Sequence, residues 1–246
     1  MPDPLLVLRL EGPLQSWGER ARWDVRDSLT EPTKSGVLGL LGAALGISRD
    51  ARFELEELDR ALRMGVRVER EGTLLNDFQT ITGFLPTAEG KVKRSSAGGP
   101  ATIISERRYL EDASFLVVFS VRARVQTMLL DQCAAALATP RWPLFLGRRA
   151  CAPSRPILVG VRSDFASLEV ALATYPWSCL GANGSVRPFN DVMSDETESR
   201  ELRVVLEAAD GTRTREDRIL SNAARLYGRR SVREYSTPFP NQEVAA

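Results

Sequence analysis

The chain has 246 residues, of which 43% are hydrophobic and 26% are charged, and its net charge is +1. These values are ordinary for a folded globular protein, and they exclude a surface that is basic throughout. The chain contains no histidine, which excludes Ser-His-Asp triads, histidine-based ribonucleases and most zinc hydrolases.

The first third of the chain predicts a strand, two helices and a second strand. Residues 5–10 form a short apolar strand that runs into a loop rich in Gly, Pro and Trp. The sequence PTKSG at residues 32–36 opens a helix that continues to Ile47. Residues 53–63 place their apolar side chains mostly on one helical face, and residues 64–69 alternate as in a half-buried strand.

The middle of the chain contains a long segment without clear periodicity, from about residue 76 to residue 109. It is too long for an ordinary connection, so it is either a functional excursion or disordered. Regular structure returns with a strongly apolar strand at residues 114–122 and a helix at residues 128–138, which Thr139-Pro140 ends.

The last third is predicted to be rich in strands. Residues 157–161 form an apolar strand, and Asp164 is expected to cap a short helix through Ala173. Residues 201–208 and 214–220 flank Asp210-Gly211, which is a strong hairpin signal. The Pro-rich tail from about Thr237 is expected to be frayed.

The order of these elements is β-α-β-β-α-β, the ferredoxin-like pattern that RNA-recognition folds share. The irregular excursion falls between the two middle strands, where a hairpin could project from the sheet. The second half adds β-rich structure without an obvious linker, and the chain has no internal repeat.

The helix start at Thr33, Lys34 and Ser35 is a candidate phosphate site. It combines a lysine, two hydroxyls and free backbone N–H groups, but the same residues also suit simple N-capping, and both interpretations stay open. It is not a P-loop, because that motif needs a glycine directly before the lysine. Trp17 in the preceding loop could stack on a base or fill the core.

Basic residues are interleaved with aromatic ones in three runs, and a further basic run lies in the excursion. On a chain of near-neutral charge this pattern favours an anionic partner. The mixed runs are RRY at residues 107–109, FLGRR at 145–149 and RLYGRRSVREY at 225–235, and the basic run is KVKR at 91–94.

The sequence shows no targeting or membrane segment and no cysteine-based site. No apolar run approaches the roughly 18 residues of a membrane span, and the first residues lack the basic start of a signal peptide. Cys133, Cys151 and Cys179 form no C-x-x-C pair, so neither a zinc knuckle nor a disulfide framework is expected. We therefore expect a cytoplasmic protein.

Several segments together resemble the CasD family of type I-E CRISPR Cascade complexes. The strongest are LxLxGPLQSWG within residues 6–18 and PTKSGVLGLLGAALGI at 32–47. RRYLEDASFLV at 107–117 and LGRRACxPxxP at 146–156 continue the resemblance in the same order. The last third is less similar, and only RLYGRRSV at 225–232 matches the closing basic strand of the family.

The resemblance implies an α+β fold of the ferredoxin-like, RNA-recognition (RAMP) type with a thumb β-hairpin at about residues 77–108. We expect this domain to span residues 1–140 and a β-rich C-terminal part, residues 141–246, to pack on it. The implied function is to bind the 5′ handle of CRISPR RNA (crRNA) as a non-catalytic subunit that caps the Cascade backbone. The implied protein partners are the neighbouring backbone subunit and the large PAM-recognising subunit, with target DNA met only through the complex and no cofactor or metal.

The resemblance also implies which residues bind RNA. They lie in the glycine-tryptophan loop, the following segment, the helix start, the thumb and its base, and the 146–149 loop. These residues are Gln15, Ser16, Trp17, Arg26, Thr33, Lys34, Ser35, Gly36, Asn76, Asp77, Gln79, Thr80, Lys91, Lys93, Arg94, Arg107, Arg108, Tyr109, Arg148 and Arg149.

Two other functions remain open at this point. The first is a metal-independent endoribonuclease that processes CRISPR repeat RNA, since tyrosine and lysine alone can in principle cleave RNA. The second is a structural adaptor whose basic patches meet an acidic protein.

Overall fold

A computed structural model describes most of the chain. The described residues are 2–19, 25–48, 51, 53–87, 89–123, 126–180, 186–188, 201–221, 224 and 226–240. Among them, no helix is both long and apolar enough to cross a membrane.

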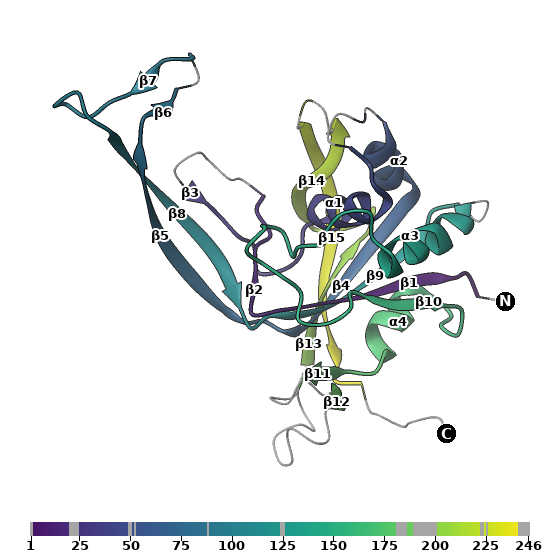
Figure 1. Cartoon of the computed structure of the whole chain (residues 1–246). Helices are drawn as coiled ribbons and strands as arrows, with labels where there is room; N and C mark the ends of the chain where they lie inside the picture. Colours follow the sequence, from purple (N-terminus) through teal and green to yellow (C-terminus); the bar gives the residue numbers. More distant parts are fainter. Residues whose placement is uncertain are drawn as a thin grey trace, which may run out of the picture.

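A seven-stranded antiparallel sheet forms the centre of the molecule (Figure 1). Its strand order is β10-β1-β9-β4-β13-β15-β14. The sheet takes strands from both the 1–140 and the 141–246 parts, and the division between these parts stays a prediction. The strands are β1 (Leu5–Glu11), β4 (Leu62–Arg70), β9 (Ser114–Val121), β10 (Leu158–Arg162), β13 (Glu201–Glu207), β14 (Arg213–Ser221) and β15 (Leu226–Pro238).

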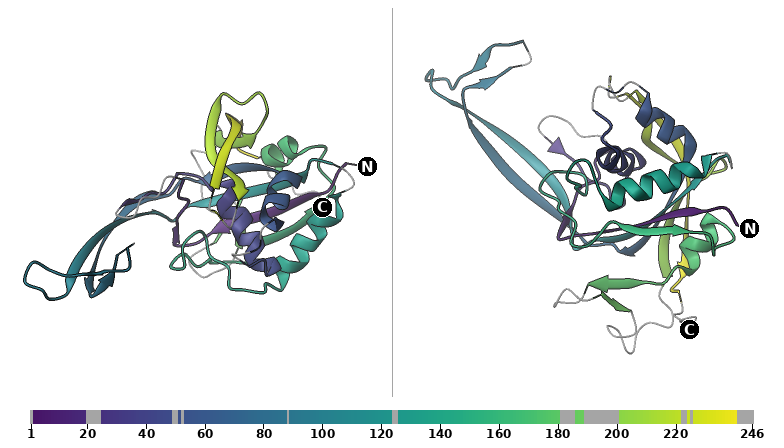
Figure 2. Two further views of the ribbon diagram at one scale, coloured as in Figure 1. Left: turned by 90° about the horizontal axis from the view of Figure 1, so that it is seen from above. Right: turned by 45° about the vertical axis from the view of Figure 1, so that its right-hand side comes forward.

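Helices cover both faces of this sheet, because its central strands are apolar on both sides. Three helices, α1 (Lys34–Leu45), α2 (Glu54–Ala61) and α3 (Met128–Ala138), lie on one face, and α4 (Leu168–Thr174) lies on the other (Figures 1 and 2). Alternate residues of β1 divide accordingly. Leu6, Leu8 and Leu10 belong to the core beneath α1–α3, while Leu5 and Val7 belong to the core against α4.

The irregular excursion forms a long hairpin that leaves the body of the molecule as a two-stranded ribbon (Figures 1 and 2). Its strands are β5 (Thr73–Gly83) and β8 (Ala101–Glu111), and two short strands, β6 (Leu85–Pro86) and β7 (Val92–Lys93), lie at its tip. The other edge of β8 pairs with β2 (Leu14–Gln15) and β3 (Val25–Arg26) at the base. A further small pair, β11 (Ser178–Leu180) and β12 (Val186–Pro188), is separate from both sheets.

Most predicted elements are present, and α3 has the predicted bounds, but two local predictions were wrong. Asp164 does not cap α4, because Ser167 accepts the Val170 N–H while Asp164 binds Arg162. The strands that flank Asp210-Gly211 do not pair with each other. Both β13 and β14 pair with β15, which therefore replaces the predicted hairpin.

The tail is also more ordered than expected as far as residue 240. Thr237 is buried, and it pairs with Leu202 in the sheet. The ring of Phe239 lies 5.8 Å from that of Trp177. Residues 241–246 lie outside the described part of the chain.

Two of the three thiols are expected to resist alkylation in the native protein. Cys133 and Cys151 are fully buried, and burial raises the pKa of Cys133 to about 11. Since the thiolate is the reactive form, only about one Cys133 thiol in a thousand is ionised at pH 8. Titration with a chromogenic thiol reagent should therefore detect at most one thiol in the native state and three after denaturation. Rapid reaction of two or three native thiols would contradict the buried positions.

Candidate nucleic-acid interface

The start of α1, the first candidate phosphate site, is occupied by the protein itself. Lys34 is completely buried, and its Nζ donates to the carbonyl oxygens of Asp59 and Leu62, each at 2.8 Å. The same Nζ lies 3.4 Å from Asp59 Oδ1 and 3.2 Å from Glu207 Oε2. Burial lowers the pKa of Lys34 from its ordinary value, and the two carboxylates oppose that change. The prediction that Lys34 contacts a phosphate was therefore wrong.

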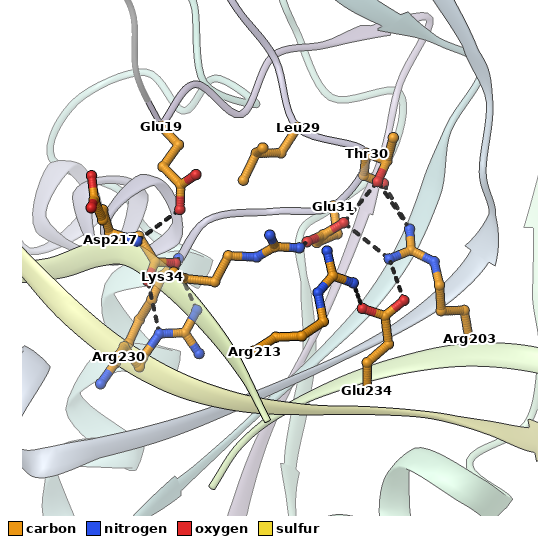
Figure 3. A network of polar contacts seen from close by, with 12 residues as sticks. Glu19, Leu29, Thr30, Glu31, Lys34, Arg203, Arg213, Asp217, Arg230 and Glu234 are labelled. Carbon is orange, nitrogen blue, oxygen red and sulfur yellow. Dashed lines mark hydrogen bonds and ion pairs between the residues drawn. The ribbon is translucent and has the colours of Figure 1, made fainter. Parts of the chain in front are cut away.

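Two backbone N–H groups at this helix start, those of Lys34 and Gly36, are also already bound. The Lys34 N–H donates to Asp217 Oδ2 at 2.7 Å, and the Gly36 N–H donates to the Thr33 hydroxyl at 3.3 Å. Asp217 is itself fixed by Arg230, whose Nη2 lies 2.6 Å from Oδ2 (Figure 3). An internal carboxylate thus lies where the sequence suggested a phosphate, so N-capping by Thr33 and Asp217 is the correct interpretation of this helix start.

A second buried carboxylate fixes the chain just before the helix. Glu31 is only 2% exposed, and it forms ion pairs with Arg203 of β13 and Arg215 of β14 (Figure 3). The helix start is therefore tied to the C-terminal strands by ion pairs on both sides. Glu31 belongs to no motif in the sequence, since its partners Arg203 and Arg215 lie 172 and 184 residues away in the chain.

The loop of residues 12–18 is structural as well. Trp17 is 1% exposed, and its Nε1 donates to Gln15 Oε1 at 3.1 Å. Gln15 is completely buried, and its Nε2 donates to the carbonyl oxygens of Leu10 and Ala113. Ser16 is buried and donates to the Arg108 carbonyl. The predicted direct RNA contacts of Gln15, Ser16 and Trp17 are therefore not available in this structure.

Arg148 is a structural link rather than a free cation. Its guanidinium lies 4.8 Å from the ring centre of Tyr109, which is buried. It also donates to the carbonyl oxygens of Arg108, Arg26 and Asp27. Arg148 thus joins the 146–149 loop, β3 and β8, and it presents Arg149 as an exposed neighbour.

Gly147 is required where this loop meets the glycine-tryptophan loop. Its φ is +97°, and a Cβ at this position would lie 1.8 Å from the Ser16 carbonyl oxygen. No other residue type fits such a close approach of two backbones. The Ser16 N–H donates to the Leu146 carbonyl at 3.0 Å, which holds the two loops together.

Three cations at the base of the β5–β8 hairpin have no side-chain partner among the described residues. Arg26, Arg107 and Arg108 are each half-buried. Within the described part of the chain, none of the three guanidinium groups forms a hydrogen bond or an ion pair, and the Nε atoms of Arg107 and Arg108 are buried without a partner. Arg26 and Arg107 are direct neighbours in the parallel β3–β8 pair. Most buried arginines elsewhere in the protein are paired, so this base cluster (Arg26, Arg107 and Arg108) is unusual.

The hairpin presents different side chains on its two faces. Asn76 and Thr80 are exposed on the face that carries Arg108, as is Phe78, whose side chain is 62% exposed. Asp77 and Gln79 lie on the opposite face and bind each other at 2.6 Å. Phe78 was not among the predicted site residues, although an aromatic residue between two polar ones at a predicted binding segment was a usable signal.

The basic residues at the tip are separate from the base cluster. Lys91, Lys93 and Arg94 are exposed near β7, and Arg94 lies over the ring of Phe84 at 5.0 Å. Arg107 lies six positions after Ala101 in β8, which corresponds to about 20 Å along an extended strand. The structure therefore divides the predicted RNA-binding residues into a buried structural set, a base cluster with its hairpin face, and a distant tip.

Comparisons with known proteins place this geometry in a family. The family model described as CRISPR-associated protein (Cas_Cas5) matches residues 5–233. The Cascade subunit CasD of Escherichia coli strain K12 is 35% identical over 163 residues, which cover 63% of this chain and 70% of that protein.

Two solved structures are similar over nearly the whole chain. A crystal structure of a Cas protein has a TM-score of 0.67 at 35% identity and covers 96% of this chain and 98% of its own. A chain of a CRISPR RNA-guided surveillance complex has a TM-score of 0.73 at 30% identity, with 98% and 93% covered. The chain belongs to the Cas_Cas5 family of CRISPR-associated proteins.

Proposed function

We propose that this protein is a subunit of a CRISPR RNA-guided surveillance complex of the Cascade type, in which it binds the 5′ handle of crRNA. The similarity to CasD and to a chain of a surveillance complex supports this function. The observation that carries the proposal is the base cluster, in which three half-buried arginines at the base of one hairpin have no side-chain partner within the described residues.

Unpaired guanidinium groups in this position call for an anion. Leaving a buried donor such as the Nε of Arg107 or Arg108 unsatisfied costs about 1–3 kcal/mol, and a phosphate that accepts its hydrogen bond removes that cost. Because residues alternate along β8, Arg107 faces the same side as Arg26, and Arg108 faces the other side. An RNA strand that bends around the hairpin base would place phosphates on both faces.

The hairpin face beside Arg108 has the groups needed to read single-stranded bases. Asn76 supplies an amide and Thr80 a hydroxyl, and Phe78 between them offers an exposed ring for stacking. Sequence-specific RNA recognition usually uses such splayed bases rather than a groove. In this proposal the β5–β8 hairpin acts as a thumb that wedges against a kinked nucleotide, with Lys91, Lys93 and Arg94 near its tip.

We infer that the fold is a modified ferredoxin-like, RNA-recognition fold. The order β10-β1-β9-β4, with α1 and α3 on one face and antiparallel neighbours, supports this inference. The β5–β8 hairpin is then an insertion between its two middle strands. The strands β13–β15 would form the β-rich extension, which packs on the first part through α1 and β4.

We propose that this role is non-catalytic and that the protein acts in the cytoplasm. Its proposed protein partners are the neighbouring backbone subunit and the large PAM-recognising subunit. Histidine, the commonest general acid and base, is absent from the sequence, which supports a binding role. The alternative is a metal-independent endoribonuclease that cuts CRISPR repeat RNA.

The Arg107→Ala/Arg108→Ala double variant tests the proposal. It should bind labelled handle RNA roughly 100-fold more weakly, since a hydrogen bond to a charged group contributes about 1.5 kcal/mol or more. The slope of log K against log salt should fall by about 1.4, because each phosphate contact on a single strand contributes roughly 0.7. Filter binding over a salt series measures both quantities.

Arg162→Ala is the matched control, since Arg162 is a partly exposed arginine on β10 that pairs with Asp164. It should bind the handle like the unmodified protein. If the unmodified protein bound handle RNA and scrambled RNA with equal affinity, the proposal would be wrong and an adaptor role would be favoured. A single discrete cut in repeat RNA incubated with EDTA would instead establish the endoribonuclease.

A further inference from the structure

A second basic feature lies away from the base cluster, between α2 and the β14–β15 hairpin. It is an open cavity of about 700 Å³, and seven of the described residues that line it are arginines, against four carboxylates. None of its lining residues belongs to β5, β8, β3 or the 146–149 loop. The cavity includes part of the basic-aromatic run at residues 225–235, which the handle site does not use.

Three of the arginines that line this cavity are neutralised by close ion pairs. Arg230 pairs with Asp217, Arg122 pairs with Glu207, and Arg63 pairs with Glu169 at 2.9 Å. The first two pairs belong to the network that also holds Lys34, because Glu207 and Asp217 contact that residue. These three pairs therefore add little net charge to the cavity.

The arginines on the rim are different. Arg218 and Arg229 have half-exposed and 80% exposed side chains. Each forms an ion pair in which its Nε lies 3.7 Å from a carboxylate oxygen, a distance too long for a hydrogen bond. The carboxylate beside Arg218 is that of Asp59, which is already bound to Lys34. Arg60 is exposed, and it donates only to the Glu56 carbonyl within the described part of the chain. Three guanidinium groups at one rim therefore have hydrogen-bonding capacity left for an anion.

An exposed aromatic residue continues the rim along β15. Residues 227, 229, 231 and 233 share one face of this strand, since side chains alternate and β15 has no bulge. Tyr227 is 52% exposed at the head of that row, followed by Arg229 and Arg233. A basic groove combined with an aromatic platform is the arrangement by which proteins bind single-stranded nucleic acid. An acidic peptide has no base that could stack on the Tyr227 ring.

We propose that this rim is a second binding site, which holds the backbone of a single-stranded nucleic acid. Arg60, Arg218 and Arg229 contact phosphates, and Tyr227 stacks on a base. The site reads no sequence, because its cations address the backbone and every base has a face that can stack. The inference rests on this cavity alone and does not depend on the handle site.

Two variants test it in the full-length protein, with a labelled 20-nucleotide RNA that lacks repeat sequence and the DNA strand of the same sequence. Arg218→Ala/Arg229→Ala should weaken binding at least five-fold and lower the salt slope by about 1.4. Tyr227→Ala should weaken binding roughly ten-fold with the slope unchanged. All three side chains are at least about half exposed, so melting curves should match the unmodified protein.

Controls separate this site from the handle site. Arg162→Ala should leave binding unchanged, and Arg107→Ala/Arg108→Ala should weaken handle RNA far more than the repeat-free RNA. A loss confined to RNA identifies a guide strand as the ligand, a loss confined to DNA identifies a DNA strand, and an equal loss identifies the backbone of either. Unchanged affinity and slope in both test variants would overturn the proposal. So would equal competition by polyglutamate with no effect of Tyr227→Ala, which points to an acidic protein.

Discussion

Replacing Lys34 by methionine is expected to lower the free energy of unfolding by about 3–5 kcal/mol. The ammonium group is completely buried between Asp59 and Glu207, which are themselves almost buried. Methionine fills a similar volume but provides no charge and no donor. Two carboxylates and the carbonyl of Leu62 then lose a partner in the interior. Denaturant titration followed by circular dichroism measures the loss.

Two further variants separate charge burial from a simple packing defect. Adding Asp59→Asn to Lys34→Met removes one of the orphaned charges, so part of the lost stability should return. Lys93→Met is the matched control, because Lys93 is exposed near the hairpin tip, and it should change stability by less than about 0.5 kcal/mol. If Lys34→Met kept full stability and lost only handle binding, the phosphate interpretation of the helix start would be restored.

The contacts of the α1 start explain why its sequence was ambiguous. A lysine, two hydroxyls and free N–H groups suit an anion from any source. The structure supplies the anion from Asp217, which lies 183 residues further along the chain. Nothing in the local pattern of Thr33–Gly36 indicates that a strand of the last third approaches it. The equivalent ambiguity at Trp17 was resolved by Gln15, whose buried side chain accepts the indole N–H.

The parts of the fold that were predictable depend on local signals. The alternation in residues 64–69 and the apolar face and Thr-Pro stop of α3 each identify one element without knowledge of the rest. The pairing of strands, in contrast, cannot be identified from a local signal. Asp210-Gly211 is a good turn sequence, yet Val232 of β15 pairs with both Glu207 and Arg213, so the third strand takes the edges that a hairpin would have used.

In the candidate site, too, local sequence signals were informative and long-range partners were not. The basic-aromatic runs include Arg107, Arg108 and Arg148, but composition does not tell which of these cations are free. Arg148 looks equivalent to Arg108 in sequence. In the structure, however, its guanidinium donates to three carbonyl oxygens and lies over the Tyr109 ring. Pairing is a long-range property, and it separates structural arginines from those available to a ligand.

Replacing Trp17 by alanine is expected to cost about 3–5 kcal/mol of stability, because the indole is one of the largest fully buried side chains and its removal leaves a cavity. The ring also packs on the start of α1, since a Cβ on Gly36 would lie 3.0 Å from it. Alanine further leaves the Gln15 Oε1 without its donor. Trp17→Phe retains most of the volume and loses the hydrogen bond, so it should cost about 1–2 kcal/mol.

Trp142→Ala is the matched control, because Trp142 is 41% exposed, and its replacement should cost well under 1 kcal/mol. Denaturant midpoints from circular dichroism compare all three variants without relying on tryptophan fluorescence. Handle binding should be measured at a temperature where each variant is folded, and Trp17→Phe should then bind normally. A phenylalanine variant that is as stable as the unmodified protein but binds the handle at least ten-fold more weakly would show that the indole stacks on a base. Such a result would also mean that the loop of residues 12–18 opens when RNA binds.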